Sequence, residues 1–162
     1  MIKYIGGLVL VLGLISFLIW TGSSDSSRAS DEELGNPNLS TLAALVAVSD
    51  FYDFGTIPIG GGNVTTTYNL TNSGEEDITI GDATTTCGCT TGEIEGVLFG
   101  MHTKLRRPIT IAPGASITLT ATFDPMAHGP AGVGLAERSL IMKTNSSVTP
   151  EVEVRFRAMV TR

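Results

Sequence analysis

The sequence contains little of what most catalytic sites and nucleic-acid surfaces are built from. It has only two histidines and two cysteines, and its 10 Lys and Arg residues are outnumbered by 16 Asp and Glu residues, for a formal net charge of −6. A nucleic-acid partner is not expected, because neutralising phosphates requires an excess of basic side chains. We also expect no catalytic activity and no cofactor.

The sequence contains no recognisable motif of a hydrolytic active site. Ser and Thr are plentiful, but nothing in the sequence resembles a nucleophile elbow. Asp50, Asp53 and Asp124 occupy turn or strand-edge positions, where Asp commonly caps backbone amides. We therefore interpret these carboxylates as structural.

Aromatic and charged residues are also scarce, at 6% and 16% of the chain. The core must therefore be built from Val, Ile, Leu and a few Phe side chains. The abundance of Thr, Gly and Ser is typical of all-β extracellular modules.

The most conspicuous feature is an uncharged apolar run near the N terminus, residues 4–20, YIGGLVLVLGLISFLIW. As a helix it would be roughly 25 Å long, slightly shorter than the ~30 Å hydrocarbon core of a bilayer. It is longer than the usual apolar run of a signal peptide. We expect residues 1–22 to form a single-pass transmembrane anchor that contacts the bilayer through residues 4–20.

The flanks of this run predict its orientation. Lys3 and Tyr4 precede the apolar run, Trp20 ends it at an interface, and an acidic, Ser-rich segment follows. This asymmetry favours an inner-membrane protein with a cytoplasmic N terminus and a periplasmic C-terminal domain. A cleaved signal peptide is the alternative, with a weak small-residue site at residues 21–23.

The rest of the chain divides into a polar linker, residues 23–41, and a region of period-two alternation, residues 42–162. Residues 64–71, 116–123 and 151–160 alternate apolar with polar side chains, and turn-forming residues separate such runs. This pattern predicts an all-β domain, a β-sandwich of about seven strands.

Two connections, residues 93–107 and 125–138, are longer than hairpin loops require. Either they cover the ends of the sandwich, or they are docking loops. The first carries an apolar cluster beside a basic one, and we expect its residues to bind a partner. The candidate partner-binding residues are Val97, Leu98, Phe99, Met101, Lys104, Arg106 and Arg107.

Three motifs point to a known family. YDFGTIPIG at residues 52–60, LTNSGEEDITIGDATTTCGCT at 70–90 and ITIAPGASITLTATFDP at 109–125 resemble DUF1573, a widespread bacterial domain of unknown function. The resemblance covers residues 48–160. It implies an Ig-like fold, related to the Hydin and ASPM/SPD-2 modules, and an exported or surface-tethered location. It implies no particular activity.

Cys87 and Cys89 are the only cysteines, and they are separated by one glycine. In an oxidising compartment we expect a structural disulfide that clamps a corner, although such a tight bridge is also compatible with thiol-redox chemistry. No Lys, Arg or His lies within ten residues of the pair to activate a thiol. The structural interpretation is therefore preferred.

A copper(I) site is the metal alternative, using Cys87, Cys89, His102 and His128. Met101 and Met126 lie beside these histidines in the sequence. The histidines show no metal-ligand spacing to each other or to the cysteines, so no metal is expected.

Together these features predict a non-catalytic, membrane-anchored accessory subunit. Its extracytoplasmic domain would bridge other subunits of a membrane complex, with a photosynthetic reaction centre or a respiratory complex as the best guess. The alternatives are a periplasmic copper-binding or thiol-redox protein that uses Cys87 and Cys89, and a pilus or surface-layer component.

Overall fold

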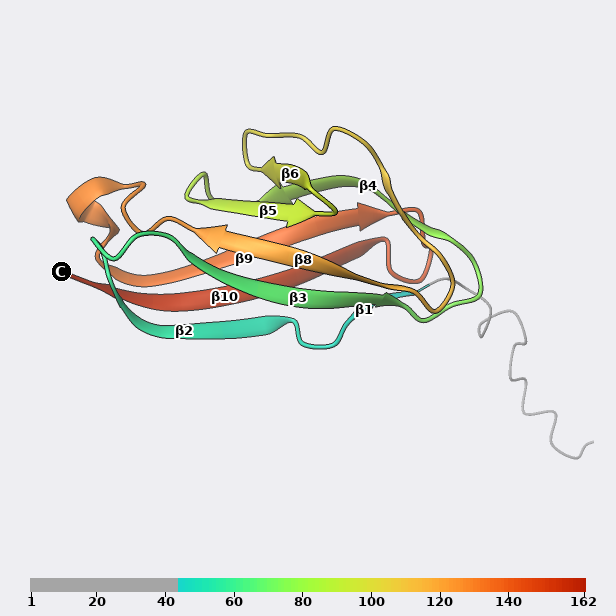
Figure 1. The fold of residues 1–162 in the computed structure, drawn as a ribbon, viewed down its shortest axis with the longest axis horizontal. Helices are drawn as coiled ribbons and strands as arrows, with labels where there is room; N and C mark the ends of the chain where they lie inside the picture. Colours follow the sequence, from blue (N-terminus) through green and yellow to red (C-terminus); the bar gives the residue numbers. More distant parts are fainter. Residues whose placement is uncertain (1–43) are drawn as a thin grey trace, which may run out of the picture. The chain divides into compact units, whose positions relative to one another are not determined.

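The computed structural model describes residues 44–162, which form two five-stranded β-sheets packed face to face (Figure 1). The strand order is β1-β3-β8-β5-β6 in the first sheet and β2-β10-β9-β4-β7 in the second. The strands are β1 (Leu45–Ala47), β2 (Phe51–Pro58), β3 (Val64–Asn72), β4 (Ile78–Thr85), β5 (Thr90–Ile94), β6 (Val97–Gly100), β7 (Ile109–Ile111), β8 (Ser116–Phe123), β9 (Gly134–Thr144) and β10 (Glu151–Thr161). A short 3-10 helix, η1 (Gly129–Gly132), lies between β8 and β9.

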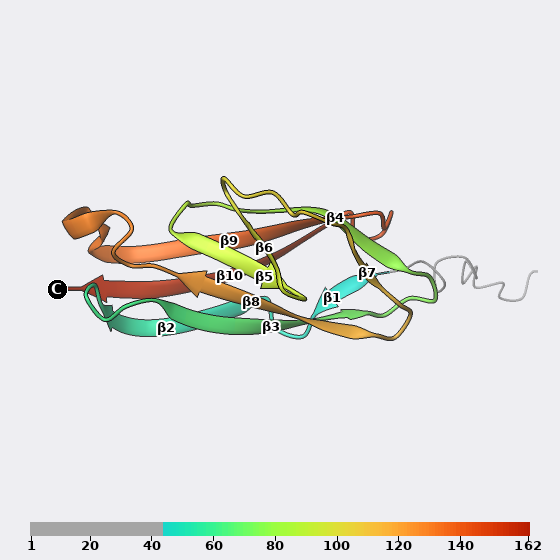
Figure 2. The same cartoon turned by 45° about the horizontal axis from the view of Figure 1, so that its top comes forward.

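The two sheets confirm the all-β sandwich that the alternating pattern predicts. The alternation itself is clearest in β10, which buries every second side chain along its length. Residues 44–162 contain ten strands rather than the expected seven or so. Part of the expected 93–107 loop belongs to the β5–β6 hairpin (Figure 2), and the expected 125–138 loop contains η1 and the start of β9. β1 and β7 have only three residues each, too few to show a period.

The expected anchor, residues 1–22, and linker, residues 23–41, lie outside the described residues, as do Lys3, Tyr4 and Trp20. Within residues 44–162, no helix has the length and apolar character needed to cross a membrane.

The Asp-Phe-Gly motif forms a bulge where β2 runs parallel to β10. The register shifts between Arg157 and Met159, and Gly55 adopts a positive φ of 66°, which only glycine adopts at little cost. The Asp53 carboxylate accepts the backbone N–H of Gly55 at 2.8 Å, and Phe54 packs edge-on against Phe156 in the core. The expected capping role of Asp53 is thereby confirmed.

Tyr68 joins the two sheets through a hydrogen bond. Its side chain is buried on β3, and its hydroxyl donates to the carbonyl of Arg155 on β10 at 2.7 Å. Because a buried phenol needs a partner for its hydroxyl, this bond fixes one sheet over the other. Burial raises the pKa of Tyr68 above its usual range, with smaller contributions from the charges of Asp50 and Tyr52.

Candidate functional site

The Cys-Gly-Cys motif forms a tight turn between β4 and β5. The N–H of Thr90 donates to the carbonyl of Cys87 at 3.1 Å, which closes a four-residue turn with Gly88 and Cys89 at its centre. The two sulfurs are bonded, and the Cα atoms lie 5.2 Å apart, within the usual range for a disulfide. Cys89 is buried and Cys87 half-buried.

Thr85, at the end of β4, holds this turn in place from the core side. Its buried hydroxyl lies 2.9 Å from the carbonyl of Cys87 and 3.0 Å from that of Thr90, and it accepts the N–H of Met101 at 2.9 Å. One hydroxyl therefore connects β4, the cysteine turn and the segment after β6. On the other side, two hydrogen bonds join the turn to β9. The N–H of Thr86 donates to the carbonyl of Ser139 at 3.1 Å, and the N–H of Ser139 donates to the hydroxyl of Thr86 at 3.0 Å.

His128 lies beside the disulfide although 41 residues separate it from Cys87. Its Nε2 is 3.2 Å from the Cys87 sulfur, and its ring is exposed. The chain after β8 brings it there through a turn in which Asp124 accepts the N–H of Met126 at 2.9 Å. The hydrogen bond from Met126 confirms the expected capping role of Asp124.

Arg138 approaches the second sulfur. Its Nε donates to the Cys89 sulfur at 3.1 Å, and its guanidinium lies 6.0 Å from the centre of the Phe123 ring. No carboxylate among residues 44–162 forms an ion pair with it. Its Nη1 also donates to the backbone carbonyl of Glu137 at 2.7 Å. The cation is therefore oriented by a carbonyl, a sulfur and an aromatic face rather than by an acidic side chain.

The strand pattern explains why an arginine is found here. Arg138 lies opposite Phe156 in the β9–β10 pairing, and directly paired residues share one face of a sheet. Phe156 is buried in the core, so Arg138 occupies an inward-facing position between buried Ala136 and Leu140. A charge placed on the core side of a strand is the signal that could have identified Arg138 from the sequence.

These contacts add to the sequence interpretation of the cysteine pair, which considered only residues near it along the chain. The absence of a cation within ten residues is a fact of the sequence, but the fold brings Arg138 and His128 to the two sulfurs. His102 also lies near, because a Cβ on Gly88 would meet its ring atoms Cδ2 and Nε2 at 3.7 Å. A candidate metal-ligating group consists of Cys87, Cys89 and His128, whose donor atoms lie within 4.8 Å of one another.

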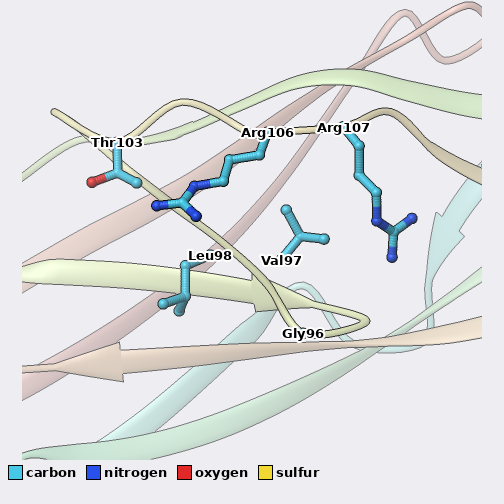
Figure 3. Close-up of a pocket in the computed structure, with 6 residues that line it drawn as sticks. All are labelled: Gly96, Val97, Leu98, Thr103, Arg106 and Arg107. Atoms are coloured by element: carbon cyan, nitrogen blue, oxygen red, sulfur yellow. The ribbon is translucent and has the colours of Figure 1, made fainter.

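A second feature is a groove of about 420 Å³ beside the β5–β6 hairpin, here called the β6–β7 groove. It is lined by Gly96, Val97, Leu98, Thr103, Arg106 and Arg107. Figure 3 shows the side chains of Arg106 and Arg107 extending on either side of Val97. Arg107 pairs with Glu95 at 3.5 Å, whereas Arg106 has no ion pair within the described part of the chain.

The structure divides the expected partner-binding residues into three groups. Four of them line the β6–β7 groove, namely Val97, Leu98, Arg106 and Arg107. Met101 and Lys104 are exposed outside its lining. Phe99 is a correction, because its side chain is fully buried in the core and unavailable to a partner. Successive side chains in a strand point to opposite faces, so Phe99 points into the core while the preceding Leu98 on β6 is exposed.

A model of the family described as "Protein of unknown function (DUF1573)" matches residues 45–160. The chain belongs to the DUF1573 family. The resemblance carried by the Asp-Phe-Gly, Cys-Gly-Cys-Thr and Ala-Pro-Gly motifs is confirmed. In this DUF1573 domain the first motif forms the β2 bulge and the second the disulfide turn. The third contains Gly114, whose φ is 70° and whose N–H donates to the carbonyl of Asn72 at 2.9 Å.

Several solved structures are similar to the DUF1573 domain. A crystal structure of a protein of unknown function from Porphyromonas gingivalis W83 has 18% identity and a TM-score of 0.57, over 74% of this chain and 48% of that chain. The secreted serine protease VesC from Vibrio cholerae has 18% identity and a TM-score of 0.46, over 77% and 24%. The PapD-like domain 7 of human CEP192 has 13% identity and a TM-score of 0.44, over 85% and 96%.

The DUF1573 chain thus spans about half the length of the Porphyromonas protein and about a quarter of the Vibrio protease. At such low identity the Porphyromonas structure shows a shared fold and nothing about activity. No curated protein matches the sequence.

Proposed function

We propose that this DUF1573 protein is a non-catalytic binding module, held at the outer face of the inner membrane, that contacts another subunit of a membrane complex through the β6–β7 groove. The observation that carries the proposal is the groove itself. Exposed Leu98 lies there beside Arg106, a cation without a carboxylate partner among residues 44–162.

The chemistry of the groove suits a polypeptide with an apolar side chain next to a carboxylate. Leu98 offers exposed apolar surface beside Val97, which lines the groove but is largely buried, and Arg106 and Arg107 offer two guanidinium groups. The Arg107–Glu95 pair is about half exposed on both sides, so it contributes little stability and is readily exchanged for a partner's carboxylate. Arginine is favoured in such places because its planar fork binds carboxylates with two hydrogen bonds.

The position of β6 adds a second mode of contact. Within the described residues β6 is an edge strand, since it pairs with β5 on one side and no further strand follows in its sheet. A mutual backbone pairing of Gly100 with Thr103 occupies only its last residue. An extended partner segment can therefore pair with the remaining edge while its side chains enter the groove.

The location rests on two features. The uncharged run at residues 4–20 supports a membrane tether, and the Cys87–Cys89 disulfide supports an oxidising compartment. A single tether and an exposed groove on a rigid sandwich suit an accessory subunit that binds its partner through a surface site.

The test is purification of the full-length chain from its host membranes in mild detergent. We expect a membrane-complex subunit to co-purify in fixed proportion with the wild type. The double variant Leu98→Asp, Arg106→Glu should lose that subunit, because it places a charge on the apolar surface and reverses the cation. Leu135→Asp is the matched control, because Leu135 on β9 is a leucine of similar exposure. Its exposed fraction is 61%, and that of Leu98 is 54%.

Recovery of the wild type only as a free monomer would overturn the proposal. So would equal loss of the partner in the groove variant and in Leu135→Asp. A photo-crosslinking residue at position 98 gives an independent readout, since it should form an adduct with the same subunit and position 135 should not.

A further inference from the structure

Three side chains with metal-binding atoms come together at the cysteine turn. The donor atoms of Cys87, Cys89 and His128 lie within 4.8 Å of one another, and His128 Nε2 is 3.2 Å from the Cys87 sulfur. We propose that the reduced form of this cluster binds a single copper(I) ion, and that the Cys87–Cys89 disulfide closes the site when it forms.

The donor set favours a soft ion. Two thiolates and an imidazole are ligands that copper(I) binds well, whereas carboxylate, carbonyl and water ligands suit harder cations. Trigonal ligands with bonds of roughly 2.0–2.3 Å are separated by about 3.5–4 Å. Once the disulfide is opened, the sulfurs of Cys87 and Cys89 can separate to such a distance while His128 remains beside them.

The charge of the surroundings favours a monovalent ion. The Arg138 guanidinium donates to the Cys89 sulfur at 3.1 Å, and the metal-ligating group holds no carboxylate. The two negative thiolates are then balanced by Arg138 and one copper(I). A zinc(II) ion would leave a net positive charge against a buried cysteine, which is unfavourable, and structural zinc sites usually take four ligands.

Exposure gives the ion a route into the site. His128 is exposed, Cys87 is half-buried and Cys89 is buried, so the ligands become progressively less accessible. The thioether of Met126, two residues before His128, is also exposed. Copper(I) therefore reaches the imidazole before it reaches the inner sulfur.

The disulfide opens by thiol–disulfide exchange. A dithiol reductant attacks the Cys87–Cys89 bond, two electrons reduce the disulfide, and the reductant leaves as its own disulfide. The two new thiols release their protons to solvent when copper(I) binds both sulfurs. When a disulfide oxidant re-forms the Cys87–Cys89 bond, it accepts the two electrons and leaves as its own dithiol, and copper(I) is released because the thiolates that held it are gone. The copper remains in the +1 state throughout.

The test uses the full-length chain in detergent under anaerobic conditions, with copper(I) supplied as its bathocuproine disulfonate complex. Reduced wild type should withdraw one copper(I) per chain from the chelator, and the oxidised protein should withdraw none. His128→Ala should weaken binding by roughly tenfold or more, and Cys87→Ser should abolish it. His102→Ala is the matched control, because His102 is the other exposed histidine near the turn, and it should bind as the wild type does.

X-ray absorption of the loaded wild type should show two sulfur ligands and one nitrogen ligand, and loaded His128→Ala should lose the nitrogen. The proposal is overturned if reduced wild type withdraws no copper(I), or if His128→Ala and His102→Ala bind alike. It is also overturned if zinc(II) at equal concentration displaces the copper. Circular dichroism of both histidine variants confirms that each is folded.

Discussion

Arg138 donates its Nε–H to the sulfur of Cys89 at 3.1 Å, across 49 residues of sequence. The arginine occupies an inward-facing position on β9, opposite the core residue Phe156. A cation in such a place favours negative charge on the sulfur, and therefore favours the reduced form of the disulfide. The cysteine turn thus combines a structural bridge with surroundings that bear on its redox equilibrium.

Replacing Arg138 with Gln should make the disulfide harder to reduce. Loss of a charged hydrogen bond worth about 1.5–3 kcal/mol lowers the reduction potential by up to roughly 60 mV. The measurement is equilibration of the full-length protein with dithiothreitol buffers, followed by thiol alkylation and mass spectrometry. Arg155→Gln removes an arginine charge on β10 without touching the sulfurs and should leave the potential unchanged. An unchanged or higher potential for Arg138→Gln would refute the role of the cation.

Gly92 on β5 should not tolerate even a methyl group. A Cβ at this position would overlap Cζ of Phe99, whose ring is fully buried in the core. Gly92→Ala should therefore cost about 1–3 kcal/mol of unfolding free energy, measured by urea unfolding with circular dichroism. Gly81→Ala on β4 meets nothing within 4 Å and should change stability by no more than about 0.5 kcal/mol.

A compensating variant separates this steric explanation from other causes. Gly92→Ala combined with Phe99→Leu removes the ring atoms that the new methyl group meets, so the pair should lose less than the sum of the two single variants. Simple additivity would show that the close approach of Phe99 to Gly92 is not the cause.

Tyr68→Phe should weaken the link between the two sheets. It removes the hydroxyl that donates to the carbonyl of Arg155 and leaves that carbonyl without this donor, at a cost of about 1–2 kcal/mol. Tyr52→Phe, an exposed tyrosine on β2, should cost nothing measurable in the same urea titration. Equal effects of the two substitutions would argue against the inter-sheet bond.

The raised pKa of Tyr68 predicts that the folded protein loses stability at alkaline pH. Burial raises the pKa of Tyr68 in the folded protein above the ordinary value of 10.0. Because the folded-state pKa is the higher one, the contribution of Tyr68 is complete below pH 10.0 and is lost as the pH rises toward the folded-state pKa. The stability difference between wild type and Tyr68→Phe should therefore shrink above pH 10.0, as followed by urea midpoints.

The lowered pKa of Asp53 predicts that the folded protein loses stability at acidic pH. The hydrogen bond from Arg157, at 2.8 Å, and then the N–H of Gly55 hold the pKa of Asp53 below its ordinary value of 3.8. A lowered pKa gives a contribution that is present above pH 3.8 and lost as the pH falls through the folded-state value. Asp53→Asn should therefore be less stable than wild type at pH 7 and approach it near pH 2.

Arg157→Gln provides the matching half of a double-mutant cycle, because it removes the partner and keeps Asp53. The coupling between the two substitutions should be measurable at pH 7 and vanish near pH 2. A coupling that does not depend on pH would show that the carboxylate charge is not what stabilises the β2 bulge. High salt should reduce it as well, because both side chains are exposed.

The fold was accessible from the sequence to the extent that the strands were long. β3, β8 and β10 each have at least eight residues, and their apolar alternation predicts their inner faces. The β5–β6 hairpin was missed, because Gly92 and Gly100 interrupt the pattern and Phe99 resembled part of an apolar loop. A glycine beneath a buried ring carries no periodic signal of its own.

The sequence alone determined the sandwich, the family, the capping roles of Asp53 and Asp124 and the closeness of the two cysteines, because alternation, turn chemistry and adjacent positions are local properties. Only the tertiary structure decided what surrounds the sulfurs. His128 and Arg138 reach them from segments 41 and 49 residues away. Strand pairing sets those distances, and a register of β9 against β4 and β10 cannot be read from spacing along the chain.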